Sequence, residues 1–195
     1  GKLTISKADA GDLSKSVSIT GWTYDGKFDS AKTLGSSAAS EAEGAEVSYA
    51  YFAKDGEGWK ELEAEPVDAG EYKVVASWPE TDNYPALTAE CEFGISKATI
   101  KASDTADRTY TGDEQTLTIG ADKATGVVEG EGLTLEGATI SGTEVNTDPG
   151  YTEVSEYTWS VAKADGSDST GNYNIEVSGK LTISKADAGD LSKSV

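Results

Sequence analysis

Residues 173–184 read YNIEVSGKLTIS, in which Tyr173, Ile175, Val177, Leu181 and Ile183 alternate with mostly polar or small residues. A period of two places these apolar side chains on one face of a β-strand. From Gly179 the chain continues as GKLTISKADAGDLSKSV to residue 195, and residues 1–17 have the identical sequence. The offset of 178 residues predicts a parent protein that repeats with that period, of which this chain holds one period and an overlap.

A weaker repeat lies inside the period. The tetrad Ile-Ser-Lys-Ala occurs at residues 5–8, 95–98 and 183–186. Between these tetrads, three short motifs align in order: 23–26 with 109–112, 68–72 with 148–151, and 83–84 with 172–173. The unit is therefore about 90 residues long, the size of a small β-sandwich. We expect an end strand of a preceding repeat at 1–7, a first module at 8–97, a second at 98–185 and the start of the next repeat at 186–195.

Strand patterns dominate the rest of the chain. Residues 47–51 and 87–95 alternate, and the turn residues 54–58 predict a hairpin that resumes at Trp59. Residues 36–43 favour a short helix or a mobile loop. We predict a mostly β chain of two tandem β-rich modules end to end, each an immunoglobulin-like β-sandwich; the alternative is a β-grasp-like α+β fold with a short helix. With no Gly/Ser/Pro-rich linker between the modules, the joint is expected to be stiff.

Composition excludes several functions. The chain has 16 basic and 35 acidic residues and a net charge of −19, which disfavours nucleic acid and direct contact with anionic membranes. It has no His, the commonest general base and metal ligand, and one Cys, so no internal disulfide can form. No apolar run approaches the ~20 residues that span a bilayer. We expect no enzyme activity, no catalytic residue, no metal and no cofactor.

The order Tyr-x-Gly, Asp-x-Gly-x-Tyr, Asn-Tyr and a closing Leu-Thr-Ile-Ser-Lys-Ala resembles the MBG and YDG modules of bacterial surface adhesins. The most similar stretch runs from Gly171-Asn172-Tyr173 to Leu181-Thr182-Ile183, and the resemblance covers both halves. The second half departs from the compact pattern in a Gly-rich stretch at 126–142. The resemblance implies tandem arrays on secreted, surface-attached proteins with adhesive or spacer roles, and it supplies no catalytic residues.

Several side chains are candidates for binding. Trp59 follows a Gly-rich turn, so it is our candidate for stacking on a sugar ring. The alternation around Trp78 and Trp159 favours core positions. Residues 165–168 with Glu176 are the nearest approach to a calcium loop but lack the required spacing. The remaining candidates have ordinary structural interpretations: Tyr24, Gly26, Tyr110 and Gly112 as packed tyrosines with turn glycines, Cys91 as an inert apolar-face residue, Trp22 as a further aromatic, and Lys2 and Lys180 as strand lysines.

Two functions follow as expectations. In the first, the chain is a tandem-repeat stalk that projects a distal binding domain from a bacterial cell surface. In the second, the modules themselves bind host glycan, mucin or matrix protein, with Trp59 in the site. The expected partners are such a host molecule and the neighbouring repeats of the same chain. We expect an extracellular, monomeric protein.

Overall fold

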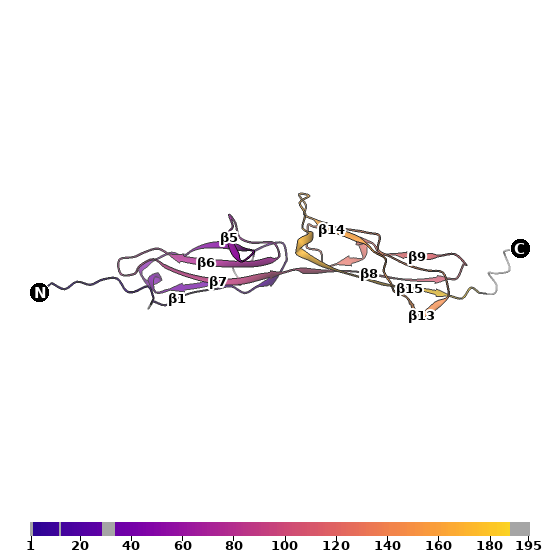
Figure 1. Cartoon of the computed structure of the whole chain (residues 1–195), viewed down its shortest axis with the longest axis horizontal. Coiled ribbons are helices and arrows are strands. Elements are labelled where there is room, and N and C mark those ends of the chain that lie inside the picture. The colour runs from indigo at the N-terminus through magenta and orange to yellow at the C-terminus, as the bar shows by residue number, and fades with distance from the viewer. Residues whose placement is uncertain (1, 12, 29–33, 188–195) are drawn as a thin grey trace. The chain divides into compact units, whose positions relative to one another are not determined.

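The structure is a computed structural model that describes residues 2–11, 13–28 and 34–187 (Figure 1). The chain is mostly β, as predicted from its alternating pattern. Its internal contacts divide it into two compact units, Gly1–Lys97 (unit 1) and Ala98–Val195 (unit 2). The last strand of unit 1 ends at Ser96 and the first strand of unit 2 begins at Ala98, so Lys97 alone separates them.

Unit 1 contains a five-stranded sheet in the order β2-β7-β6-β4-β5 and a two-stranded sheet of β1 and β3. All neighbours are antiparallel except β2 and β7, which are parallel. The strands are β1 (Lys15–Ser18), β2 (Trp22–Thr23), β3 (Gly35–Ala38), β4 (Ser48–Asp55), β5 (Gly58–Glu61), β6 (Gly70–Trp78) and β7 (Leu87–Ser96). The predicted hairpin is therefore the pair β4 and β5, joined through Gly56 and Glu57.

The core of unit 1 lies on one face of its larger sheet. In β6 every second residue from Tyr72 to Trp78 is buried, which is the period-two pattern of a strand with one covered face. Trp78 is 1% exposed, and its indole N–H donates to Glu41 Oε1 at 2.7 Å. A large aromatic side chain can be buried at this position because its one polar group has an acceptor.

The stretch 36–43 forms neither an α-helix nor a plain loop. Its first residues belong to β3, and the rest form the 3₁₀-helix η1 (Ala39–Glu43). The helix ends at Gly44, whose φ is 83°. Helix-forming Ala and Glu residues indicated a helix here, but pairing of β3 with β1 takes the first half of the stretch. Five residues remain, and they form a single short 3₁₀ segment rather than an α-helix.

Unit 2 contains a four-stranded sheet in the order β10-β8-β15-β13 and two two-stranded sheets, β11-β14 and β12-β9. Strands β8 and β15 are parallel over twelve residues, and every other pair is antiparallel. The strands are β8 (Ala98–Thr109), β9 (Gln115–Thr118), β10 (Ala124–Thr125), β11 (Gly132–Glu136), β12 (Thr139–Gly142), β13 (Asn146–Tyr151), β14 (Thr158–Ala162) and β15 (Tyr173–Ser184). Two 3₁₀ turns complete the unit, η2 (Ala121–Lys123) and η3 (Thr170–Asn172).

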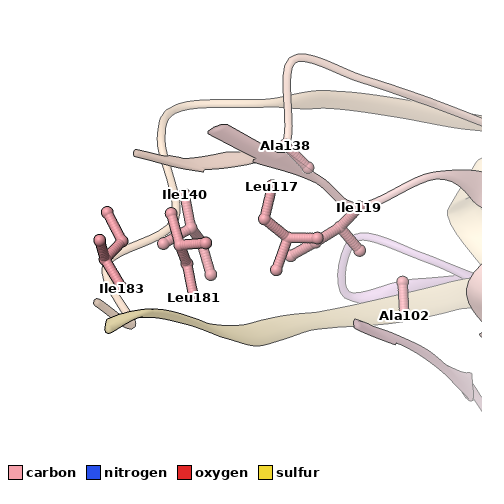
Figure 2. Close-up of a cluster of buried hydrophobic side chains, with 7 residues drawn as sticks. All are labelled: Ala102, Leu117, Ile119, Ala138, Ile140, Leu181 and Ile183. Carbon is pink, nitrogen blue, oxygen red and sulfur yellow. The ribbon is translucent and has the colours of Figure 1, made fainter. Parts of the chain in front are cut away.

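The core of unit 2 is an aliphatic cluster between β15 and the β9-β12 pair. Figure 2 shows Leu181 and Ile183 of β15 beside Ile140 of β12 and Leu117 of β9. The rest of the cluster consists of Ala102, Ile119 and Ala138. Strand β15 is flanked on its two edges by β8 and β13, so its backbone is paired on both sides while its apolar face is covered.

The Tyr-x-Gly motif occupies the same place in both units. In unit 1 Thr23 lies opposite Ser96 on the parallel neighbour, and in unit 2 Thr109 lies opposite Ser184 in the same way. The tyrosine after each threonine donates its backbone N–H to the carbonyl oxygen of that serine, at 2.8 Å in both units. The glycine two residues further has a φ of 80° in unit 1 and 88° in unit 2, a conformation that favours glycine. The motif therefore ends the strand that runs parallel to the last strand of its unit, β2 in unit 1 and β8 in unit 2, against the serine of the tetrad.

The tyrosine of the second motif also occupies matching positions. Tyr72 lies opposite Phe93 in unit 1, and Tyr151 lies opposite Leu181 in unit 2. Each partner precedes the isoleucine of its tetrad by two residues. The Tyr72 hydroxyl donates to the backbone carbonyl four residues upstream at 2.7 Å, and the Tyr151 hydroxyl donates to the one seven residues upstream at 3.0 Å. Tyr72, near the start of β6, and Tyr151, at the end of β13, thus each tie their strand to the chain that precedes it.

In both units a glutamate from an earlier segment holds the Asn-Tyr motif. The Glu43 carboxylate accepts hydrogen bonds from the Thr81 hydroxyl at 2.7 Å and the Asn83 amide at 2.6 Å. In unit 2 the Glu131 carboxylate accepts one from the Tyr173 hydroxyl at 2.5 Å. The aligned motifs are thus anchored by the same kind of contact, although the donor groups differ.

The two copies of the exact repeat have different surroundings. Residues 179–184 form the second half of β15, where Leu181 and Ile183 are 0% exposed. The equivalent residues 2–6 belong to no strand, and Leu3 and Ile5 are 85% and 84% exposed. After them, Lys7 contacts Glu80, and the Ala8 N–H donates to the Asn83 carbonyl at 3.2 Å. Of the segment 186–195, residues 188–195 lie outside the described residues.

Candidate functional site

Trp59 lies on the outer face of the five-stranded sheet of unit 1. It stands opposite Lys54 in the β4-β5 hairpin, and Phe52 stands opposite Lys73 on β6. Because side chains alternate along a strand, these four project from one face, opposite to the face of the buried Val74. The structure thus places Trp59, the candidate from the sequence, in a cluster of aromatic and lysine side chains that the sequence analysis did not predict.

Two ammonium groups lie over the indole ring of Trp59. Lys54 Nζ is 4.7 Å from the ring centroid and Lys73 Nζ is 5.3 Å from it. Lys73 Nζ also lies 5.5 Å from the Phe52 ring centroid and 3.2 Å from a carboxylate oxygen of Glu90. Cation–π contacts at exposed sites contribute about 0.5–1 kcal/mol each, so the cluster stabilises the half-buried tryptophan in place.

A shallow hollow of about 240 Å³ adjoins the tryptophan. It is lined by Trp59, Glu71, Tyr72, Glu92, Phe93 and Gly94. The aromatic edge and two carboxylates are groups that can contact the apolar face and the hydroxyls of a sugar. A sugar stacking on the indole would compete with the Lys54 and Lys73 ammonium groups for the ring face.

The other tryptophans have packing roles. Trp78 is buried, as its alternation predicted. Trp22 stacks on Phe93 with ring centroids 5.7 Å apart and meets Phe28 edge-on at 5.4 Å. Trp159 is only partly buried, although its sequence pattern favoured a core position. It lies on β14, which pairs with β11 alone, and a two-stranded ribbon covers a side chain less completely than a wide sheet does.

The acidic loop 165–168 uses its carboxylates for its own turns. Asp165 accepts hydrogen bonds from the Ser167 N–H at 2.9 Å and hydroxyl at 2.6 Å, and Asp168 accepts the same pair from Thr170 at 3.0 Å and 2.6 Å. These bonds, led by the side-chain hydroxyl in each case, hold the pKa of both carboxyls below their ordinary value. Glu176 instead lies 3.4 Å from Lys101.

Across 2–11, 13–28 and 34–187, no group of three or more His, Cys, Asp or Glu side chains is placed to hold a metal ion. Cys91 is a half-buried thiol whose Sγ lies 3.5 Å from the Glu92 carbonyl. Lys2 is exposed and Lys180 is partly buried in β15. The structure therefore brings none of these candidates together with Trp59.

Sequence reasoning missed the role of η1 and of the segment after β5. Glu41 and Glu43 of η1 reach Trp78 and Asn83, contacts between residues about 40 positions apart that no local pattern reveals. From the end of β5 the chain leaves the sheet with three glutamates at alternate positions, Glu61 as the last residue of β5 and then Glu63 and Glu65. That alternation was visible in the sequence and could have drawn attention to this surface.

Comparison of the chain with protein-family models and with curated proteins gives no match. In the part of the chain that the structure describes, no helix has the length and apolar character needed to cross a membrane.

Proposed function

We propose that the chain is a stretch of a tandem-repeat stalk of a bacterial surface adhesin, in which modules of about 90 residues serve as spacers for a distal binding domain. The observation that carries this proposal is the pair of identical segments 1–17 and 179–195. The second copy closes unit 2 as a buried strand, and the first bears the same apolar side chains in water. A preceding module of the unit 2 kind would bury Leu3 and Ile5 as unit 2 buries Leu181 and Ile183.

The matching motif positions support a modular array. The tetrad isoleucine and serine end the last strand of each unit, and Tyr-x-Gly ends the strand parallel to it, β2 or β8, against them. Duplication lengthens such an array without new contacts, because each module has its own core. A single period therefore contains two variants of one structural unit joined by one residue.

The proposed architecture of each unit is a variant of the immunoglobulin-like sandwich. Three features support it: an early strand (β2 or β8) parallel to the last, antiparallel neighbours beside the last strand, and a tyrosine hydroxyl bonded to the backbone upstream of its strand. The β-grasp alternative requires a helix that covers a sheet face, and η1, at five residues, is too short for that.

The second candidate is glycan, mucin or matrix binding by the modules themselves. The half-buried Trp59 beside its hollow favours it, whereas the two ammonium groups over the ring oppose it. The proposed stalk needs no ligand on the modules. A test of whether the isolated chain binds glycan, mucin or matrix protein therefore distinguishes the stalk function from the binding function.

Chains of one, two and three 178-residue periods test the stalk by small-angle X-ray scattering. A spacer is expected to add the same increment to the maximum dimension with each period. A maximum dimension that stays constant as periods are added would overturn the proposal, because the modules would then be folding back on one another.

The chain is then tested for binding to mucins, glycans and matrix proteins, with the Trp59→Ala variant and an equally acidic unrelated protein beside it. The stalk proposal expects no saturable binding above the acidic protein. Saturable binding that Trp59→Ala loses would assign adhesion to the modules.

A further inference from the structure

The larger sheet of unit 1 has an edge that is only half covered. Strand β5 pairs with residues 52–55 of β4, whereas β6 pairs with residues 48–53 on the other side. The last contact of the hairpin is the Leu62 N–H, which donates to the Tyr51 carbonyl at 2.8 Å. Beyond it, within the described part of the chain, residues 48–50 of β4 have no strand on this side.

A hollow of about 450 Å³ opens where the two segments diverge. It is lined by residues 47–51 on one side and residues 61–65 on the other. Alternate residues of a strand direct their backbone groups to the same neighbour, so the Tyr49 N–H and C=O face the same side as the Tyr51 carbonyl. The hollow therefore presents main-chain donors and acceptors to an additional strand.

The far wall of the hollow is acidic. Glu61, Glu63 and Glu65 line it at alternate positions, all exposed, and none of the three carboxylates has a hydrogen-bond or ion-pair partner within residues 34–187. Burial, and after it the charge of Glu65, raises the pKa of Tyr51 to about 12. The negative potential of the wall thus reaches the strand at the base of the hollow.

We propose that this edge binds an extended basic peptide by β-strand addition, with lysine or arginine side chains at alternate positions facing the three glutamates. Main-chain hydrogen bonds to β4 provide the affinity, and the glutamates provide the preference for a basic strand. The Tyr49 ring, 36% exposed at the rim, offers a surface for an aliphatic side chain or lysine stem.

The same glutamates also oppose pairing of this edge with other copies of the chain. Charged residues beside an open edge are a known means of preventing edge-to-edge association. For a protein with a net charge of −19, an acidic edge repels its own copies and attracts basic strands. The acidic edge beside β4 is therefore expected to exclude acidic strands and to accept basic ones.

The experiment measures fluorescence anisotropy of a labelled peptide Ser-Lys-Thr-Lys-Val-Lys-Thr with the full chain at 150 mM salt. The probe is compared with its glutamate-for-lysine version and with a version N-methylated on alternate backbone amides. The test variant is Glu61→Gln/Glu63→Gln/Glu65→Gln. The matched control is Glu71→Gln/Glu90→Gln/Glu92→Gln, which removes the same charge from the outer sheet face.

We expect saturable binding that the test variant weakens by about tenfold or more and the control by less than about twofold. The glutamate and N-methylated peptides should not bind, and the probe should slow hydrogen exchange of the Tyr49 amide. Absence of saturable binding would overturn the proposal. So would equal losses in both variants, or undiminished binding of the N-methylated peptide, because either result would indicate non-specific attraction to an acidic protein.

Discussion

Residues 2–6 and 180–184 have one sequence and two environments. Leu181 and Ile183 are fully buried in β15, whereas Leu3 and Ile5 are 85% and 84% exposed. The difference is not in the residues but in their neighbours: β15 has β8 and β13 on its edges and the β9-β12 pair over its apolar face. An alternating pattern therefore specifies a strand only where a sheet is present to receive it.

The two units also place shared motifs in different surroundings. In both, an early strand pairs in parallel with the last strand, but β2 does so over two residues and β8 over twelve. Unit 1 joins five strands in one sheet, and unit 2 divides its strands among three. The shared motifs fix this parallel pair of strands, and the regions between the two strands differ from one unit to the other.

The largest expected effect is a difference in stability between two matched leucine substitutions, one in each copy of the repeat. Leu181→Ala should lower the free energy of unfolding of unit 2 by about 2–5 kcal/mol, because it leaves a cavity in the aliphatic cluster. The matched variant Leu3→Ala should change it by less than about 0.5 kcal/mol. Denaturant titration of both variants measures the difference. Equal costs would show that the first copy also packs against the chain.

A glycine substitution compares the second motif of the two units, in which Gly70 begins β6 and Gly150 is the penultimate residue of β13. Gly150 has a φ of 84°, and a Cβ there would lie 2.9 Å from Lys180 Cε and 3.1 Å from the Leu181 carbonyl oxygen. Gly150→Ala should therefore cost about 1–3 kcal/mol. Gly70→Ala, whose Cβ would meet only the Tyr72 side chain at 3.1 Å, should cost less. Thermal unfolding followed by calorimetry ranks the two, and a reversed order would contradict this account.

The tyrosine hydroxyls provide a finer comparison. Tyr72→Phe removes one hydrogen bond, to the Asp68 carbonyl, whereas Tyr151→Phe removes two, since its hydroxyl also accepts from the Glu144 N–H at 3.1 Å. Each bond contributes about 0.5–1.5 kcal/mol, so the second variant should lose more. If neither variant is destabilised in denaturant titration, the hydroxyls do not hold these loops.

The smallest expected effect is the dependence of the stability of unit 1 on pH. Side-chain hydrogen bonds from Asn83 and then Thr81 hold the pKa of Glu43 below its ordinary value of 4.5. A carboxyl with a lowered folded-state pKa stabilises the fold above its unfolded pKa, and that contribution is lost as pH falls through the folded value. The melting temperature of unit 1 should therefore decrease as the pH is lowered below 4.5.

Glu43→Gln should reduce that drop, while Glu46→Gln, at an exposed glutamate nearby, should leave it in place. Melting curves recorded from pH 6 to pH 2.5 make the comparison. A drop of the same size in Glu43→Gln would assign the acid sensitivity to other groups.

Much of the fold could be predicted from the sequence. Alternation located β4, β6, β7 and β15, and the Asp55-Gly56 turn located the hairpin. The sequence favoured a short helix or a loop at residues 36–43, and residues 39–43 do form a short 3₁₀-helix. It did not predict that β3 takes the first residues of this stretch or that Trp159 is only partly buried, because both depend on which strands pair. Trp59 could be named as a candidate, but Lys73 over its ring comes from another strand and needed the β4-β6 register.

The measurement that tests the modular account most directly is hydrogen exchange on a chain in which residues 98–178 precede Gly1. The account predicts that the Leu3 and Ile5 amides, which then continue a complete unit, become as slow to exchange as those of Leu181 and Ile183. If they still exchange at the rate of an unstructured peptide, the repeated segment is not the end of a repeated module, and the stalk proposal fails with it.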